Sequence, residues 1–446
     1  MTFIRAACLL TVAFLISVCS GALSANQGAC ETLAFFSPHN SEDKARISVS
    51  GWHCYWKDGL RIDSPQKNLT FKGNLSIFVD GGFIGVDETL DHDFANLDGS
   101  ELTFRRLRLS AFGTIYEWMQ IKIDIDWANV QDIKDDWFRF TKLPMVGHLT
   151  VGHMKEPFSF EESTSGASRT FMEKALPVDA FSPGRNIGIS RYTPFLNQRA
   201  TWGAGAFLNT GSFANAGQAN DRIDEANGFG ITGRITGLPW YEDDGKQLLH
   251  LGLSYRHDFR DADDTGFPLR IRARPESALT DQRLIDTGPI YASGVDLFNT
   301  ELAVVHGPFS LQGEYFHSFA DANTQGDPSF WGYYLQCSLF LTGEHRTYNT
   351  RSGVFSRLQP NHPFRPGKDV CGAWEIGVRF SYADLNDKII KGGKEHNLTA
   401  GLNWYLDTNI RFVFNYVRAV VEDRERQPAV QDGRADIFQG RFQIDF

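Results

Sequence analysis

Methionine and cysteine are scarce in this sequence, and long hydrophobic runs are almost absent. The 446 residues include 5 Met and 6 Cys, and the mean hydropathy is −0.30. Beyond the first 25 residues, no stretch approaches the roughly 18 consecutive apolar residues that a membrane helix requires. Low hydropathy suits a soluble protein, but it equally suits a membrane barrel, because half of each barrel strand is polar.

An excess of positive charge is lacking as well. The sequence holds 44 Lys plus Arg against 54 Asp plus Glu, a net charge of −10. This balance argues against a nucleic-acid partner and, taken alone, against an anionic partner too. No nucleophile elbow, phosphate loop or zinc-like spacing of His and Cys is present, and His153 and His345 are expected on polar strand faces. We therefore expect no enzyme activity, no cofactor and no metal.

The N-terminus has the pattern of a secretory signal peptide over residues 1–25. Arg5 precedes an apolar run from Ala6 to Val18, and small residues follow as far as Ala25. A lipoprotein signal at Cys19 is the alternative, although Val18 is larger than the residue such sites normally carry. We expect the chain to be exported.

Four cysteines lie beyond the signal peptide: Cys30, Cys54, Cys337 and Cys371. An even number in an exported chain is compatible with disulfides, and four cysteines allow three connectivities. Proximity in the sequence favours the pairs Cys30–Cys54 and Cys337–Cys371. Free buried thiols are the alternative.

Aromatic residues and glycine are abundant, with 36 Phe, 13 Tyr, 10 Trp and 42 Gly. Apolar and polar residues alternate in "MQIKIDIDW", "LLHLGLSYRHD" and "WEIGVRFSY", and "DIFQGRFQIDF" continues the alternation to the last residue, Phe446. The apolar side is bulky in every such stretch. A soluble sandwich would need a very large core to cover it, whereas a barrel needs only a bilayer, so we predict an all-β transmembrane antiparallel barrel.

Tight turns and long polar connections alternate between these strands. "VVHGPFSLQ" and "WYLDTNIRF" contain hairpin turns, whereas the connections from Asp258 to Gly288 and from Arg346 to Val370 are long. Short turns at one end and long loops at the other are typical of outer-membrane barrels. We predict an N-terminal segment over residues 26–67 and a single barrel domain over residues 68–446.

Several stretches together resemble the phosphate-selective outer-membrane porins O and P. They are "FRRLRL", "VGHMKEPFSFEE", "RTFMEKALP", "FSPGRNIGI", "FLTGEHRTY", "GAWEIGVRFS" and "GLNWYLDTNIRF", and the likeness runs in order from about Trp56 to Phe446. The resemblance implies a trimeric barrel of sixteen strands in outer-membrane lipid, with an inward loop forming a basic constriction. It also implies that the barrel-assembly machinery reads the aromatic strand ending at Phe446.

The resemblance points to an arginine pair, Arg105 and Arg106, as anion contacts. Alternation turns Arg106 and Arg108 toward the lumen, because Leu107 and Leu109 face outward. Arg105 has the opposite parity. It would either extend toward lipid headgroups or be turned inward by a bulge. The alternative is that all three arginines simply lie on a strand face exposed to water.

The inward loop is expected in "EPFSFEESTSGASRTFMEKALPVDAFSPGRN". The family carries two serines and an arginine there; this chain has Ser165, then Gly166, and Lys174 in place of the arginine. Lysine keeps the charge but loses the planar fork that meets phosphate bidentately. Two flanking cations, Arg169 and Arg185, either contribute to the site or pair with the acidic residues of the loop.

These expectations describe a passive anion channel that takes inorganic phosphate, polyphosphate or other small anions. Residues 101–191 contain twelve basic and twelve acidic side chains, so selectivity would depend on where the charges lie. The alternatives are a general diffusion porin, a structural envelope barrel with a plugged lumen, and a secreted β-domain that binds glycans.

Overall fold

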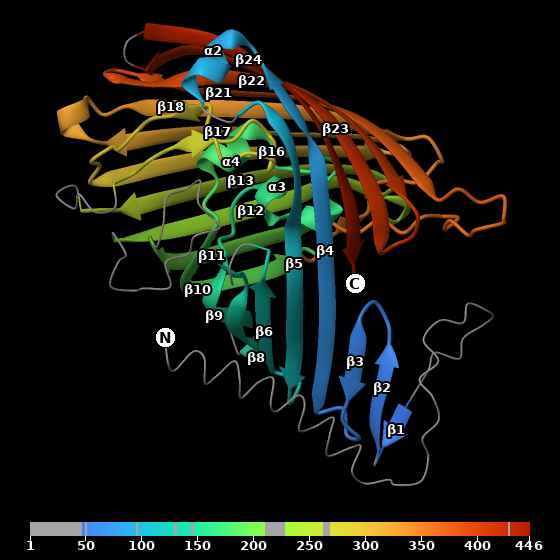
Figure 1. The fold of residues 1–446 in the computed structure, drawn as a ribbon. Helices are drawn as coiled ribbons and strands as arrows, with labels where there is room; N and C mark the ends of the chain where they lie inside the picture. The colour runs from blue at the N-terminus through green and yellow to red at the C-terminus, as the bar shows by residue number, and fades with distance from the viewer. Residues whose placement is uncertain are drawn as a thin grey trace.

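The computed structural model describes residues 47–49, 51–94, 97–128, 132–143, 147–209, 228–261, 268–426 and 429–446. Sixteen antiparallel strands form a closed barrel, because the last strand pairs with the first from Ala435↔Val86 to Asp445↔Ser76 (Figure 1). In order around the barrel, they are β4 (Leu69–Val86), β5 (Gly99–Ile115), β6 (Met119–Asp126), β8 (Asp136–Leu143), β9 (Gly147–Lys155), β10 (Arg185–Phe195), β11 (Ala200–Leu208), β12 (Phe229–Glu242), β13 (Gln247–Phe259), β16 (Gly294–His306), β17 (Phe309–Asp321), β18 (Ser329–Phe340), β21 (Ala373–Asp387), β22 (Ile390–Tyr405), β23 (Ile410–Arg426) and β24 (Ala429–Asp445).

The strands turn their polar side chains inward and their apolar side chains outward. On β13, His250, Ser254 and Arg256 are buried, whereas Leu251 and Leu253 are exposed. A soluble sandwich has the opposite arrangement, since its apolar faces meet each other. The predicted barrel, with an apolar outer wall and a polar interior, is confirmed, and no helix in the described residues is long and apolar enough to cross a membrane.

The two ends of the barrel differ in their connections. One end, here called the turn end, carries short turns such as residues 307–308 and 406–409, and Phe446 lies there with its N–H bonded to the Leu75 carbonyl. The loop end carries most of the longer connections, including residues 260–293. We expected both long connections at one end, but residues 341–372 lie at the turn end. The reason is strand direction: β18 runs toward the turn end, where the Phe364 N–H bonds to the Leu406 carbonyl at 2.6 Å.

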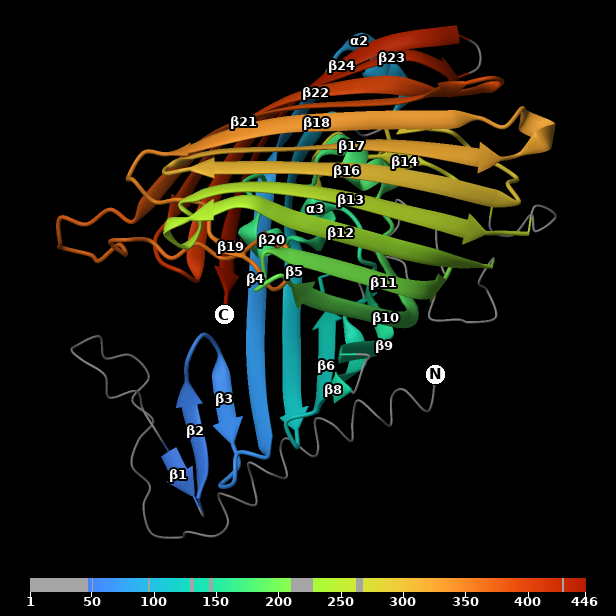
Figure 2. The ribbon, with the colours of Figure 1, turned by 180° about the vertical axis from the view of Figure 1, so that it is seen from behind.

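Three connections fold into the barrel (Figures 1 and 2). Residues 156–184 contain α3 (Phe160–Ser163), η1 (Gly166–Ser168) and α4 (Leu176–Phe181), which confirms the predicted inward loop. Residues 268–293 and the part of 341–372 around residues 348–355 were not expected inside. They contribute β14 (Arg272–Ala273), β15 (Ile285–Asp286), β19 (Tyr348–Asn349) and β20 (Val354–Phe355).

Apolar contacts hold these segments against the inner wall. Phe158 and Phe181 belong to a buried cluster that includes Phe316 and Phe330 of the wall. A second cluster joins Phe160 to residues 348–355 and to β13 and β16. Complete burial of one aromatic side chain contributes about 1.5–3 kcal/mol to stability, and this burial holds the inserted segments in place.

Three strands precede the barrel and extend its wall at the turn end (Figure 1). Pairing of β4 with β24 stops at Ser76. Strand β3 (Leu60–Asp63) pairs with β4 over residues 70–73, so that it covers an edge that would otherwise be open. The Trp56 ring meets the Phe446 ring edge-on, with centroids 5.1 Å apart. The remaining elements are β1 (Ile47–Val49), β2 (Trp52–Trp56), β3 (Leu60–Asp63), α2 (Glu88–Asp93), β7 (Asp132–Ile133), η3 (Asp243–Gly245) and η4 (Asn323–Gln325).

The cysteine predictions have different outcomes. Cys337 and Cys371 carry free thiols, so the predicted pair is wrong. Cys337 lies opposite Val378 in the sheet, seven residues beyond Cys371, or roughly 20 Å at the rise of a strand. A disulfide needs Cα atoms within about 7 Å. Cys30 and the predicted signal peptide lie outside the described residues, so the Cys30–Cys54 pair stays a prediction.

Candidate functional site

A bulge in β5 turns two neighbouring arginines into the lumen. Arg106 lies opposite Phe78 on β4, but Phe104 lies opposite the next residue, Val79, so Arg105 is an extra residue in the ladder. Phe104 remains exposed on the outer wall. Of the two positions that the sequence left open for Arg105, the structure has the inward one.

Two of the three β5 arginines are neutralised by carboxylates. Arg105 forms a bidentate pair with Glu173 of the inward loop, at 2.9 Å from Nε to Oε1 and 3.0 Å from Nη2 to Oε2. Arg108 pairs with Asp126 at 3.1 Å and with Asp124 at 3.4 Å. Local pairing of this kind cancels most of the field that a cation would present to an ion in the lumen.

Arg106 differs from its neighbours. Its guanidinium lies over the Phe78 ring, with Cζ 4.2 Å from the centroid, and within the described residues it makes no hydrogen bond and no ion pair. A cation–π contact fixes the group but leaves its N–H donors available. The N–H donors of Arg106 are therefore not taken up by another described residue.

The segment Ser165–Arg169, which includes η1, lies among several cations. Its carbonyl groups accept hydrogen bonds from the inner wall and the turn-end connection: Ala167 from Gln443 at 3.2 Å, Ser168 from Arg346 at 2.7 Å and Arg169 from Arg411 at 2.8 Å. Two of these carbonyls thus hold guanidinium groups beside the segment, and the third holds an amide.

Arg169 projects from the end of this segment. Its Nε donates to the Glu161 carbonyl at 3.2 Å and its Nη2 to the Thr164 carbonyl at 3.4 Å. Among the described residues no carboxylate oxygen lies within 4 Å of its guanidinium. Backbone carbonyls orient the group without removing its charge, and the Glu161 and Glu162 carboxylates interact with it at longer range.

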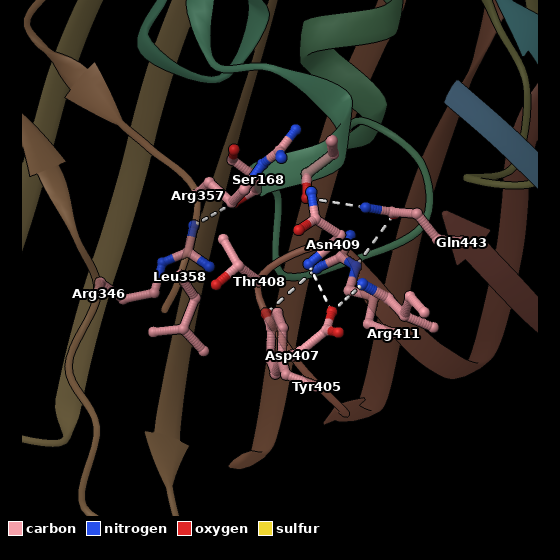
Figure 3. Close-up of a pocket in the computed structure, with 12 residues that line it drawn as sticks. Ser168, Arg346, Arg357, Leu358, Tyr405, Asp407, Thr408, Asn409, Arg411 and Gln443 are labelled. Atoms are coloured by element: carbon pink, nitrogen blue, oxygen red, sulfur yellow. Dashed lines mark hydrogen bonds between the residues drawn. The ribbon is translucent and has the colours of Figure 1, made fainter. Parts of the chain in front are cut away.

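A pocket opens on the turn-end side of the same segment (Figure 3). Arg411 donates there to Tyr405 Oη and Gln443 Oε1, each at 3.1 Å, and Arg357 pairs with Asp445. The pocket is lined by Ala167, Ser168, Arg346, Arg357, Leu358, Tyr405, Asp407, Thr408, Asn409, Ile410, Arg411 and Gln443.

Sequence reasoning missed Arg346, Arg357 and Arg411. Strand alternation in "NIRFVFNY" places Arg411 with Val413 and Asn415 on the inner face, so parity alone could have identified it. Arg346 and Arg357 lie in a long connection without strand periodicity. Nothing in their local sequence indicates that the connection folds inward.

Lys174 and Arg185 form ion pairs with carboxylates of the protein. The Lys174 ammonium lies 3.2 Å from Glu162 and 3.5 Å from Asp179, and its side chain is 17% exposed. Burial raises the pKa of Glu162, but Lys174 and Lys155 outweigh this effect and hold the pKa well below its usual range. Arg185 pairs with Asp135 at 2.7 Å.

The seven predicted anion contacts therefore divide into groups. Arg106, Ser165 and Arg169 come together at the tip of the inward loop, and Arg105 lies beside them but is paired. Arg108, Lys174 and Arg185 are each engaged by carboxylates elsewhere. Their direct role with an anion stays a prediction. No group of His, Cys, Asp and Glu in the described part of the chain could hold a metal ion.

Comparison with known proteins gives a consistent result. The family model described as phosphate-selective porin O and P matches residues 78–446. Porin O of Pseudomonas aeruginosa is 26% identical over 427 residues, which cover 87% of this chain and 91% of that protein.

Two solved structures share the barrel fold. The outer membrane channel DcaP of Acinetobacter baumannii matches with a TM-score of 0.53 and 9% identity, over 86% of this chain and 99% of that one. The anion-selective porin from Comamonas acidovorans matches with a TM-score of 0.50 and 12% identity, over 84% and 100%. Identities this low establish similarity of fold alone.

Proposed function

Because this chain belongs to the phosphate-selective porin O and P family, we propose that it forms a passive channel for small anions, phosphate among them. It is an outer-membrane β-barrel of a channel-forming family. A passive pore must offer an ion substitutes for its water without holding it tightly. Several cationic donors placed in sequence within a narrow passage meet that requirement.

The availability of Arg106 carries the proposal. Most lumen arginines of the described wall are paired, for example Arg234 with Glu301 at 2.8 Å and Arg441 with Asp80 at 2.7 Å. Arg106 has no such partner, and the chain holds it over Phe78 at the tip of the inward loop. An anion that enters the constriction meets one strong, unoccupied donor there.

Further cations continue toward the turn end. Arg169 of the inward loop lies beyond Arg106, and Arg411 lies beyond Arg169, to whose carbonyl it donates a hydrogen bond. An anion leaving Arg106 would therefore find another donor in the direction of the C-terminus. Transfer between several weak sites permits rapid conduction, whereas a single deep site would trap the ion.

Phosphate selectivity is the finer part of the proposal. The resemblance places an arginine where this chain has Lys174, and here Lys174 neutralises Glu162 and Asp179. A lysine in that position supplies no planar fork, and a paired lysine supplies little field. We therefore propose an anion-selective channel that binds phosphate weakly.

A structural barrel with a closed lumen is the second candidate. Three inserted connections favour it, since they fill the lumen with buried apolar clusters. It predicts no ion conductance in a planar bilayer, whereas the channel proposal predicts stepwise currents.

The channel proposal is tested by comparing Arg106→Gln with Arg191→Gln. Arg191 is a matched control, because its guanidinium lies over Trp202 on the outer wall. Reversal potentials under a potassium chloride gradient should shift toward cation selectivity in Arg106→Gln and stay unchanged in Arg191→Gln. Equal reversal potentials in the two variants would contradict the role of Arg106.

A further inference from the structure

Glu276 lies where the loop-end insertion, residues 268–293, meets the inward loop. The residue is 3% exposed, and its carboxylate accepts hydrogen bonds from three other elements. Its Oε1 accepts from the N–H of Leu176 at 3.0 Å and from Ser381 Oγ at 2.5 Å, and its Oε2 accepts from Thr399 Oγ1 at 2.6 Å. One buried carboxylate therefore joins the insertion to α4 of the inward loop and to β21 and β22 of the wall.

The backbone at Glu276 is also held firmly. Its φ is 51°, in the left-handed region that residues with a side chain rarely adopt, and such a conformation persists only where surrounding contacts fix it. Gln439 of β24 supplies two of these contacts. Its Nε2 donates to the Glu276 carbonyl at 3.0 Å, and its Oε1 accepts from Ser277 Oγ at 2.9 Å. The wall thus fixes the point from which the Glu276 side chain extends.

Glu276 holds residues 173–176 of the inward loop at both ends. It binds the N–H of Leu176 directly, and at the other end it acts through Arg379 of β21. Nε and Nη2 of Arg379 donate to Glu276 at 3.0 Å and 2.5 Å, and Nη1 donates to the Glu173 carbonyl at 3.2 Å. Because the guanidinium is planar, its two bonds to Glu276 fix the direction of the third.

The side chain of Glu173 is the counter-charge of two lumen arginines. Its carboxylate binds Arg105 at 2.9 Å and 3.0 Å and Arg441 at 2.7 Å. Bidentate hydrogen bonds between guanidinium and carboxylate depend strongly on geometry, so a displacement of Glu173 would weaken them. The contacts of Glu276 with residues 173–176 oppose such a displacement, although no hydrogen bond joins Glu276 to either of these arginines within the described residues.

We propose that Glu276 is a positioning residue for ion selectivity. It holds Glu173 where that carboxylate neutralises Arg105 and Arg441, so the loop-end insertion sets how much positive charge the constriction presents to an ion. The proposal rests on the proposed function, because it concerns the selectivity of the same pore.

The variant Glu276→Gln tests this role. Glutamine has a similar size and still accepts from the Leu176 N–H, but it has no charge for Arg379 and its own N–H donors face those of the guanidinium. Reversal potentials under a potassium chloride gradient should move toward anion selectivity. The shift should not exceed that of Glu173→Gln, because Glu276 acts only through Glu173.

Asp87→Asn is the matched control at the same end of the barrel. The Asp87 carboxylate likewise accepts from backbone N–H groups, those of Leu90 at 3.0 Å and Arg434 at 2.7 Å, but these bonds join α2 to β24 and not to an inserted segment. Its reversal potentials should equal those of wild type. Both variants should keep the electrophoretic mobility of the folded barrel. If Glu276→Gln does not fold, Arg379→Lys takes its place, since lysine keeps the charge but cannot bind Glu276 and the Glu173 carbonyl together in the same way.

The double variant separates positioning from general support of the loop. Once Glu173→Gln has removed the carboxylate that is positioned, adding Glu276→Gln should change the reversal potential no further. A double variant that shifts further than Glu173→Gln alone would show that Glu276 acts by another route, and this result would overturn the proposal.

The outcomes also separate this proposal from the proposed function. If Arg106→Gln reduces anion selectivity while Glu276→Gln leaves it unchanged or lowers it, the positioning role is wrong and the channel proposal stands. If Arg106→Gln has no effect while Glu276→Gln and Glu173→Gln shift the potential together, the positioning role stands and the role of Arg106 is wrong. A wild-type barrel that carries no current would overturn both.

Discussion

At the scale of single residues, the lumen contains many charged side chains, but most of its cations are paired with carboxylates. Arg379 pairs with Glu276 at 2.5 Å, Arg256 with Glu156 at 2.8 Å, and Arg105 with Glu173. Because these pairs are local, the net charge of −10 says little about selectivity. We expect the few cations that form no ion pair, Arg106 and Arg169 above all, to decide which ions are attracted.

Removal of one loop carboxylate should strengthen anion selectivity. Glu173 binds Arg105 and also Arg441, at 2.7 Å, so Glu173→Gln leaves two lumen cations less compensated. Reversal potentials under a salt gradient should move further toward anion selectivity. Glu422→Gln, on the exposed outer side of β23, is the control and should have no effect. A shift of Glu173→Gln toward cations would contradict this reasoning.

Acid should loosen the inward loop only at low pH. The pKa of Glu162 is lower in the folded protein than its ordinary value of 4.5, since Lys174 and Lys155 outweigh the effect of burial. A depressed carboxyl pKa stabilises the fold fully above pH 4.5, and the stabilisation is lost as the pH falls toward the folded pKa. Channel conductance should therefore stay constant from about pH 7 to pH 5 and change below pH 4.5.

The variant Lys174→Gln tests the same pair. It should change conductance already at neutral pH and reduce the further change on acidification. Lys142→Gln alters only an exposed pair with Glu117 and should behave as wild type. A wild-type conductance that changes between pH 7 and pH 6 would argue against Glu162 as the controlling group.

At the scale of elements, the sequence was informative about strands and poor about what fills the barrel. Alternation is a local property, so "LLHLGLSYRHD" alone predicts which side of β13 faces the lumen. The inward position of Arg105 depends on a bulge against β4, and parity allowed two outcomes. The resemblance to known porins supplied the inward loop of residues 156–184.

The insertion of residues 268–293 and 341–372 could not be predicted, because it depends on contacts between distant parts of the chain. Arg346 of the turn-end connection donates a hydrogen bond to the Ser168 carbonyl of the inward loop at 2.7 Å. Glu276 accepts one from the N–H of Leu176 at the start of α4, at 3.0 Å. Each residue looks like an ordinary polar residue in its own segment.

Removing the packing of the turn-end insertion inside the barrel should widen the channel. Tyr348 and Phe355 pack on Phe160 inside the barrel, with ring centroids 6.4 Å and 5.0 Å away. Replacement of residues 348–355 by a Gly-Ser linker removes that packing and should raise single-channel conductance. An equal replacement of residues 361–368, which are largely exposed, is the control. Equal conductance in both variants would mean that the insertion does not limit the pore.

At the scale of the whole molecule, the barrel wall is uneven. β6, β8 and β9 contain 8, 8 and 9 residues, whereas β4 contains 18 and β24 contains 17. A strand needs roughly 9–11 residues to cross a bilayer. The low wall over β6–β9 is therefore poorly suited to face lipid, and we propose that other copies of the chain cover it in a homotrimer.

Cross-linking should locate that interface. Phe138 on β8 is 53% exposed, and Phe319 on β17 is 43% exposed on a taller part of the wall. With the native cysteines replaced by serine and the membranes treated with a thiol cross-linker, Phe138→Cys should give linked protomers and Phe319→Cys should not. Unheated samples should migrate as a trimer and boiled samples as a monomer. The reverse cross-linking result would place the interface elsewhere on the wall.

The position of the C-terminus is another property of the complete barrel. Phe446 lies at the turn end against Leu75 and Trp56, where it completes the joint between the last strand and the first. Recognition of this strand by the barrel-assembly machinery stays a prediction. Deletion of Phe446 should lower the yield of folded, heat-modifiable barrel in the outer membrane. An unchanged yield would remove this role from the terminal residue.

The reversal potential of the wild-type channel at low ionic strength tests anion selectivity most directly. Screening is weakest there, with a Debye length of about 30 Å at 0.01 M salt, so the fields of both the net charge and the local cations are strongest. Placement of Arg106 and Arg169 at the constriction predicts an anion-selective potential. A cation-selective potential would show that the acidic net charge governs the pore and would contradict the assignment of these arginines.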